Sequence, residues 1–331
     1  MTQLEKERLA RVGKEFNAKK YIREEIAAIR ERVGSKKVLL AMSGGVDSAV
    51  CAVLLHQAIG RQLACVFVDH GFLRLDEAKE VKSVFQGQFG IKLVQVDAEK
   101  RFLAKVKGIT DPELKRKCIG SEFVEVFREE AAKLGKIEFL GQGTIFSDIV
   151  ESGGGGHKAV KAHHNVGGLP GDLGFEGLVE PVKYLYKDEV RKVGKALGIP
   201  GAMVMRQPFP GPGLAVRCLG ELTKEKLDIL RQADFIFRDA MAKARLDRKA
   251  QQFFAVMTNV KSVGVKNNAR TFGYVIALRA VSTSQFVKAG VVELPFRFMA
   301  RVAGKIASTV DGVNRVVWDI TPKPPATIEW E

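Results

Sequence analysis

The feature that most constrains the fold is a short apolar segment that ends abruptly in glycines. Residues 37–42 are mainly apolar, the string Ser43-Gly-Gly-Val-Asp-Ser48 follows directly, and residues 49–58 are again apolar. A buried strand, a glycine-rich turn and a buried helix in succession predict a parallel α/β sheet. The turn would lie where a strand ends and a helix begins, and unpaired N–H groups and the helix dipole favour anions there.

The six-residue turn predicts a phosphate site. Its two glycines let the backbone approach phosphate oxygens, and Ser43 and Ser48 can donate hydroxyl groups. Asp47 suits such a site if Mg²⁺ lies between its carboxylate and the phosphates. The turn is not a Walker A loop, because no Gly-Lys-Ser/Thr follows it. The alternative, an ordinary serine-capped turn, fits a bare Gly-Gly pair better than this full string.

Apolar segments that alternate with helical patterns continue along the chain. Further buried strands are predicted at 63–68, 91–96 and 137–141. Pro208-Phe-Pro-Gly-Pro-Gly213 predicts a hinge into a second domain. Beyond it the predicted elements are helices at 224–243 and 295–310 and strands at 253–257, 260–265, 271–280 and 313–320. This order indicates an α+β domain with antiparallel strands, so the predicted domains are 1–206 and 207–331.

The chain is strongly basic, and the location of the charge limits the class of partner. Its 331 residues include 53 Lys and Arg and 38 Asp and Glu, a formal charge of +15. Such a surplus suggests nucleic acid, an anionic membrane or phosphorylated small molecules. Residues 38–206 hold 23 basic and 21 acidic side chains, whereas residues 207–331 hold 19 and 11. Because the phosphate turn lies in the nearly neutral part, we expect mononucleotides and protein partners and no nucleic acid.

Hydropathy and cysteine spacing exclude several further classes. No window reaches about 18 uninterrupted apolar residues, which argues against a membrane partner. The N-terminus is charged from its start, unlike a secretory signal. The four cysteines include no Cys-x-x-Cys pair, which argues against a zinc ribbon, an iron–sulfur site or a disulfide framework. A reducing, cytoplasmic location is therefore expected.

The turn resembles the pyrophosphate loop (PP-loop) of the N-type ATP pyrophosphatases, which cleave ATP between the α and β phosphates and adenylate a substrate oxygen. Longer strings resemble the GMP synthetases among them: 111–120, 141–152, 163–170, 180–191, 206–217 and 323–331. This resemblance covers the chain from about residue 20 onward. It implies an α/β fold, a doubly wound parallel sheet like that of the adenine nucleotide alpha hydrolases, followed by a smaller α+β dimerisation domain.

The resemblance also implies an activity, namely adenylation of XMP at O2 by ATP and amination by ammonia to give GMP, AMP and pyrophosphate. ATP is then a co-substrate and Mg²⁺ a cofactor, and the enzyme is a carbon–nitrogen ligase, a glutamine-hydrolysing GMP synthase. No cysteine lies in a glutaminase-type elbow, and the phosphate turn already begins at residue 43. The resemblance is therefore to the ATP-pyrophosphatase subunit of two-chain GMP synthetases. A glutamine amidotransferase subunit would supply ammonia, and a homodimer would form through the C-terminal domain.

Site residues follow from the same resemblance. Those implied to bind ATP are Ser43, Gly44, Gly45, Val46, Asp47, Ser48 and Val68, and Asp47 is also the implied metal ligand. Those implied to act in catalysis are Lys183, Lys187, Asp148 and Glu151. Those implied to bind XMP are Arg116, Lys158, Lys161, Arg206, Lys323, Ile328 and Glu329.

The residue types suit this chemistry, although each has a plainer alternative. Lys183 and Lys187 are four apart and would share a face if helical, where they could neutralise pyrophosphate, or simply pair with neighbouring acidic residues. Asp148 and Glu151 are three residues apart. The resemblance implies that they belong to a mobile segment that closes over the XMP base. The alternative is that they lie in a solvated loop. Arg116 lies in a Lys-Arg-Lys run that by composition alone is typical of a solvated surface.

Two other functions remain open from the sequence. One is a PP-loop enzyme that adenylates tRNA, although such enzymes commonly add a Cys pair or an RNA-binding domain. The other is a basic scaffold with a degenerate loop, against which the intact Ser-Gly-Gly-Val-Asp-Ser string argues. The adjacent His163 and His164 have no carboxylate or Cys at metal-ligand spacing, so a structural or substrate-contacting role is expected for them.

Overall fold

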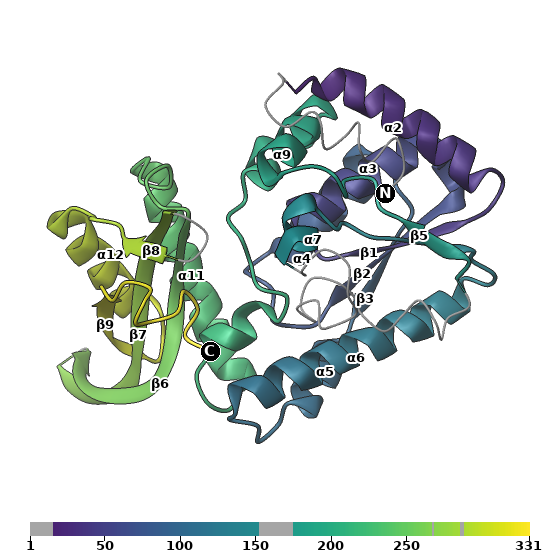
Figure 1. Ribbon diagram of the computed structural model, residues 1–331. Helices are drawn as coiled ribbons and strands as arrows, with labels where there is room; N and C mark the ends of the chain where they lie inside the picture. The colour runs from purple at the N-terminus through teal and green to yellow at the C-terminus, as the bar shows by residue number, and fades with distance from the viewer. Residues whose placement is uncertain (1–15, 152–174, 267, 285–287) are drawn as a thin grey trace. The chain divides into compact units, whose positions relative to one another are not determined.

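The computed structural model describes residues 16–151, 175–266, 268–284 and 288–331 (Figure 1). The chain divides into two compact units. The first unit comprises Met1–Asp69, Glu77–Ala98 and Gly120–Arg206. The second unit comprises His70–Asp76, Glu99–Ile119 and Gln207–Glu331. Two short segments that precede residue 206 in the chain therefore complete the second unit.

A five-stranded parallel sheet forms the centre of the first unit. Its strands, in the order β3-β2-β1-β4-β5, are β3 (Leu93–Asp97), β2 (Leu63–Asp69), β1 (Val38–Met42), β4 (Phe139–Gly141) and β5 (Gly177–Val179). Strand β1 is central, and its side chains are almost all buried. A continuous apolar run is what a parallel strand covered on both faces requires. The predicted α/β class is confirmed, whereas the short strand β5 was not predicted.

Helices cover both faces of this sheet (Figure 1). The helices of the first unit are α2 (Ala18–Val33), α3 (Val46–Ile59), α4 (Glu77–Lys82), α7 (Phe146–Glu151), α9 (Lys187–Ala196) and α10 (Gly201–Val204), together with the later turns of α6 (Pro112–Lys133). Helices α2, α3 and α9 pack together on one face. Because α3 is enclosed on almost every side, it is apolar nearly all round rather than amphipathic.

The second unit is built on a four-stranded sheet. Its main elements are α11 (Lys224–Lys243), β6 (Gln252–Lys266), β7 (Ala269–Ser284), β8 (Lys288–Val291), α12 (Phe296–Thr309) and β9 (Val313–Asp319). The unit also includes α5 (Glu99–Lys105), the first turns of α6, and the short 3-10 helix η3 (Gly213–Arg217). The apolar faces of α11 and α12 pack against the sheet (Figure 1).

The sheet of the second unit differs from the sequence prediction in two ways. The predicted strands 253–257 and 260–265 are one strand, β6, with a register shift between Met257 and Lys261. Strand β7 pairs antiparallel with β6 and β8, but β9 pairs with β7 in parallel. A parallel pair needs a crossover connection, and α12 lies in the segment that leads to β9. The α+β class is confirmed, although the sheet is not purely antiparallel.

Candidate functional site

The glycine-rich turn links β1 to α3 and is held closed by its own serines. The Ser48 hydroxyl donates to the Gly45 carbonyl at 3.0 Å, and the Ser43 and Ser48 hydroxyl oxygens lie 3.2 Å apart. Gly44 has φ +75°, a conformation that side chains other than glycine rarely adopt. Gly45 caps α3, so the first N–H groups of that helix belong to this turn. The turn therefore has the backbone geometry of an anion-binding helix start.

A second glycine packs directly against this turn. A Cβ atom at Gly143 would lie 3.0 Å from the Ser48 nitrogen and 3.2 Å from the Asp47 carbonyl carbon. Only glycine fits such a close approach without displacing the backbone. The segment after β4 therefore supports the turn from one side. Val68, another residue implied to bind ATP, is a buried member of β2.

Lys187 and Asp47 form an ion pair at the turn. The Lys187 Nζ and Asp47 Oδ2 atoms are 2.6 Å apart, and 38% of the lysine side chain is exposed. Lys187 is the first residue of α9, where the helix dipole disfavours a cation, and Asp47 offsets that cost. The neighbouring acidic residues are used differently, since Asp188 pairs with Arg191 and Glu189 accepts from the Tyr186 N–H. Lys187 therefore pairs with the distant Asp47 and not with Asp188 or Glu189, its acidic neighbours in the sequence.

The other carboxylate oxygen of Asp47 has an unusual environment. Asp47 Oδ1 is buried, and among the described residues no donor lies within hydrogen-bond distance of it. A buried carboxylate oxygen without a partner is costly, and carboxylate oxygen is the ligand type that Mg²⁺ prefers. This atom fits the metal role that the resemblance implies for Asp47. Within the described ranges, no group of three His, Cys, Asp or Glu residues is arranged to hold a metal ion.

The remaining predicted catalytic residues lie at two places in the first unit. Lys183 precedes α9 in a turn, so it does not share a helix face with Lys187, and its Nζ lies 2.9 Å from Glu180 Oε2. Asp148 and Glu151 both lie in α7, so they are helical rather than in a loop. The Asp148 carboxylate accepts from the Ile145 N–H at 3.0 Å. Lys158 and Lys161 lie outside the described residues.

Arg206 contacts the phosphate turn rather than the predicted XMP-binding residues at the end of the chain. Its Nη1 donates to the Gly44 carbonyl at 3.3 Å and to Glu77 Oε1 at 2.7 Å. Its Nη2 donates to Glu80 Oε2 at 2.6 Å. One guanidinium therefore links the carbonyl of the left-handed glycine to two carboxylates of α4. The XMP-binding role of Arg206 that the resemblance implies stays a prediction.

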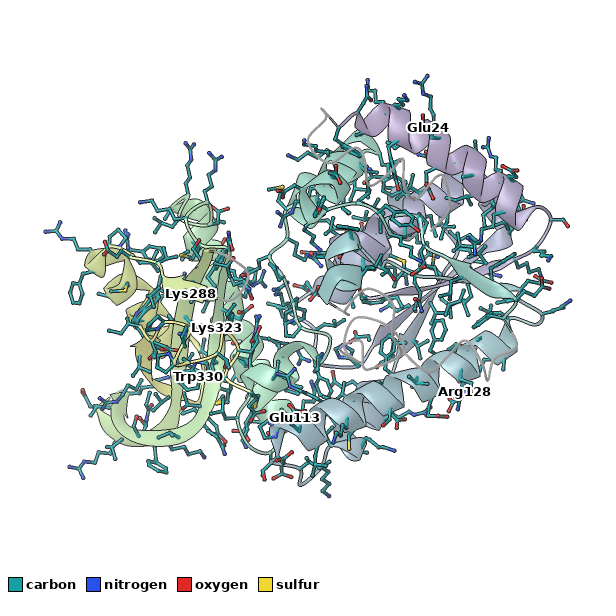
Figure 2. The ribbon with its side chains drawn as sticks, viewed as in Figure 1. Glu24, Glu113, Arg128, Lys288, Lys323 and Trp330 are labelled. Carbon is teal, nitrogen blue, oxygen red and sulfur yellow. The ribbon has the colours of Figure 1, made fainter. Side chains whose placement is uncertain are left out.

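The other predicted XMP residues within the described ranges, Arg116, Lys323, Ile328 and Glu329, lie together in the second unit, around the chain segment 321–331, called the tail below. Arg116 donates to the backbone carbonyl of Glu331. Lys323 exchanges two backbone hydrogen bonds with Ala289 of β8, and Figure 2 shows its side chain beside that strand. Ile328 and Trp330 pack against the core cluster of Phe254, Val256 and Ala277. A cavity of about 490 Å³ is lined by residues 317–321, 326–327 and 329–330, and Glu329 is among them.

Three buried cations that the sequence did not single out hold this tail. Lys115, Arg217 and Arg279 are all completely buried. Lys115 binds the Glu331 carboxylate and the Cys218 carbonyl. Arg279 donates to the backbone carbonyls of Thr321, Thr327 and Ile328 and to the Asp319 carboxylate. The solvated surface that composition predicts for the Lys-Arg-Lys run is therefore wrong for Lys115, because its partners come from distant segments.

Burial and neighbouring charges shift the pKa values of two groups near these sites, the Cys51 thiol and the Asp319 carboxyl. Burial raises the pKa of the Cys51 thiol in α3, and the nearby Asp47 charge raises it further, so Cys51 is not an activated nucleophile. Burial also works against ionisation of Asp319, but hydrogen bonds from Thr321, the Arg279 charge and Trp330 outweigh it and lower the pKa of this carboxyl. The carboxylate that anchors the tail is thereby kept charged.

Two family models match the chain in two separate regions. A family model described as NAD synthase matches residues 17–119, and one described as GMP synthase C terminal domain matches residues 239–330. A solved structure of NMN synthetase from Francisella tularensis has a TM-score of 0.45 at 15% identity and covers 71% of this chain and 93% of its own. No helix within the described residues is long and apolar enough to cross a membrane.

Curated relatives are much more similar in sequence. The "GMP synthase [glutamine-hydrolyzing]" of Acetivibrio thermocellus is 57% identical over 311 residues, which is 94% of this chain and 61% of that protein. The protein of the same description from Clostridium novyi is 54% identical over 324 residues, 98% of this chain and 63% of that protein. The chain thus spans about three fifths of the relatives' length. The chain is similar to proteins described as GMP synthase over nearly its whole length, and its matched segments are similar to NAD synthase and to the GMP synthase C terminal domain.

Proposed function

We propose that this chain catalyses the ATP-dependent amination of XMP. In the first step, XMP O2 attacks the α-phosphorus of ATP and pyrophosphate leaves. In the second step, ammonia attacks C2 of the adenylated intermediate, the oxygen leaves with AMP, and loss of protons from nitrogen gives GMP. The observation that carries the proposal is the turn at Ser43–Ser48 with its Lys187–Asp47 pair, in a chain 54–57% identical to proteins named GMP synthase.

Each group of the first unit has a defined part in this proposal. The N–H groups at the start of α3 and the hydroxyls of Ser43 and Ser48 bind the phosphates of ATP. Lys187, already at the turn, neutralises the charge that develops on the leaving pyrophosphate. Asp47 Oδ1 is the atom that would hold Mg²⁺, which when bound supplies further charge neutralisation. Lys183, Asp148 and Glu151 remain proposed participants.

The tail of the second unit is proposed to bind XMP. Arg116 and Lys323 provide positive charge for the nucleotide phosphate, Ile328 an apolar contact, and Glu329 an acceptor for a purine N–H. Lys158, Lys161 and Arg206 remain candidates from the resemblance. We further propose that residues 1–206 and 207–331 are the catalytic and dimerisation domains, that the enzyme works as a cytoplasmic homodimer, and that an amidotransferase subunit supplies its ammonia.

The test is AMP release from ATP by the purified chain. We expect AMP only when both XMP and ammonium are present, and little when glutamine replaces ammonium. Asp47→Asn keeps the size of the side chain but removes the carboxylate, so it should abolish most of this activity. AMP formation with tRNA and without XMP would contradict the proposal and support the tRNA-modifying alternative. Efficient use of glutamine by the chain alone would contradict the need for a separate amidotransferase.

A further inference from the structure

Arg217, in the second unit, is held by an ion pair and by two aromatic rings. It ends the 3-10 helix η3 and is completely buried. Its Nε donates to Glu329 Oε2 at 2.9 Å and its Nη2 donates to Glu329 Oε1 at 2.8 Å. The guanidinium carbon also lies 3.9 Å from the centre of the Phe254 ring and 5.1 Å from that of Phe209. The plane of the guanidinium is therefore fixed by aromatic rings, and the plane of the Glu329 carboxylate is fixed by the guanidinium.

The other buried cations hold different parts of the tail. Lys115 binds Glu331, and Arg279 binds the backbone at 321, 327 and 328 together with Asp319. Trp330 adds a hydrogen bond from its indole N–H to Asp319 at 2.9 Å. Among the described residues, Arg217 is the cation paired with Glu329. Removing it would leave the other anchors of the tail in place.

The Arg217–Glu329 pair is also a poor source of stability. Arg217 Nη1 is buried, and no described residue accepts a hydrogen bond from it. Burying a guanidinium with one unsatisfied nitrogen costs free energy, and buried ion pairs in general contribute little net stability. Two parallel N–H···O bonds, in contrast, fix the direction of a carboxylate very well. Orientation of Glu329 is thus the stronger physical consequence of this contact.

We propose that Arg217 is a positioning residue for nucleotide recognition. Resting on the function proposed above, Arg217 holds the Glu329 carboxylate so that its remaining lone pairs face the purine N–H of XMP. Lysine cannot replace it, because an ammonium is a point charge and makes no planar fork. The effect is expected on XMP and not on ATP, because the phosphate turn belongs to the first unit.

The experiment compares KM values for XMP and ATP in the ammonia-dependent reaction. Arg217→Met and Arg217→Lys are each expected to raise KM for XMP about 10- to 100-fold, the size of a lost charged hydrogen-bond pair. KM for ATP should stay within about twofold. The matched control is Glu293→Gln, the same kind of change at an exposed glutamate between β8 and α12, which should leave both KM values nearly unchanged.

A double-variant cycle separates positioning from a general loss of structure. If Arg217 acts through Glu329, then Arg217→Met should add almost nothing to the effect of Glu329→Gln on KM for XMP, whereas its effect should be fully retained beside Glu293→Gln. Both tryptophans of the chain, Trp318 and Trp330, lie in the second unit, so their fluorescence reports whether the tail is docked. If Arg217→Met loses the native tryptophan emission, the KM values of Arg217→Lys, which keeps the buried charge, test the proposal in its place.

Two results would overturn the proposal in distinguishable ways. If the native chain forms AMP from XMP and ammonia but the Arg217 variants keep its KM for XMP, or change both KM values equally, Arg217 is a structural residue only. If the native chain forms no AMP with XMP, the proposed function itself fails and the inference fails with it.

Discussion

Two lysine–carboxylate pairs in this molecule have the same chemistry, but one is partly exposed to solvent and the other is buried. Lys187 and Asp47 lie at the phosphate turn with 38% and 24% of their side chains exposed, and one oxygen of the aspartate has no donor among the described residues. Lys115 and Glu331 join α6 to the tail with 0% and 5% exposed, and Glu331 receives further bonds from Gly220 and Arg116. A solvated pair exchanges partners at little cost, whereas breaking a buried pair leaves an uncompensated charge.

This difference in exposure suits the two pairs to different purposes, exchange of ligands at the turn and fixed geometry at the tail. The pair at the turn can open, so its lysine is available to an incoming anion and its aspartate to a cation. The pairs around the tail are closed, so they fix the positions of the residues proposed to recognise XMP. Variants of the residues in and around these pairs test this contrast.

Lys187→Met removes the exchangeable cation and is expected to lower the rate of AMP formation about 10²- to 10³-fold, because one donor to developing charge is lost. The fold should be unaffected, since both side chains of the pair are partly exposed. The control is Lys192→Met, an exposed lysine on the same helix, which should keep the native rate. Activity of Lys187→Met within a few-fold of native would show that the pair is only structural.

Acid should weaken the second unit through His70. Burial, and then the charge of Arg231, lower the pKa of His70 from 6.5 to about 4, and its Nδ1 accepts from the Phe72 N–H at 3.0 Å. The unfolded chain therefore binds a proton that the folded chain does not, and stability falls as the pH drops from 6.5 towards 4, by about 3 kcal/mol in total.

Denaturant unfolding followed by tryptophan fluorescence at several pH values measures this loss. In His70→Asn, which keeps an acceptor for the Phe72 N–H but cannot be protonated, the decline between pH 6.5 and 4 should be smaller by that amount. An unchanged pH dependence would mean that other groups cause it.

Arg206→Met tests whether this guanidinium supports the phosphate turn or binds XMP. Its contacts with Gly44 and Glu77 lead us to expect KM for ATP to rise about tenfold while KM for XMP changes little. Glu80→Gln, which removes only the more exposed contact, should have an effect of about twofold or less. A rise confined to KM for XMP would instead support the role that sequence resemblance implies.

Local patterns predicted the parts of the fold that depend on local physics. Parallel strands buried on both faces are continuous apolar runs, so β1 and β2 could be located, and the glycine turn between β1 and α3 could be assigned to anions. Strand β5 has only three residues, too few for a periodic pattern. The bulge in β6 interrupts its alternation, which is why one strand resembled two.

Long-range contacts explain what the sequence did not reveal in the site. Lys115 resembles a surface residue because its partner Glu331 is 216 residues away. Arg217 lies in a proline- and glycine-rich string whose spacing gives no hint of Glu329, 112 residues further on. The four-residue spacing of Lys183 and Lys187 suggested a shared helix face, but α9 begins only at Lys187, and its partner Asp47 is in another helix.

The discontinuous second unit also bears on how the chain folds during synthesis. Its segments His70–Asp76 and Glu99–Ile119 leave the ribosome before Gln207–Glu331, the segment that they pack with. Contacts between distant segments form slowly, and apolar surface that waits for a partner is exposed to aggregation. Release of a shortened chain, for example one that stops at residue 206, would leave Phe72 and Phe102 without the rest of their unit. The synthesis of residues 207–331 therefore governs whether these residues, made before them, become buried.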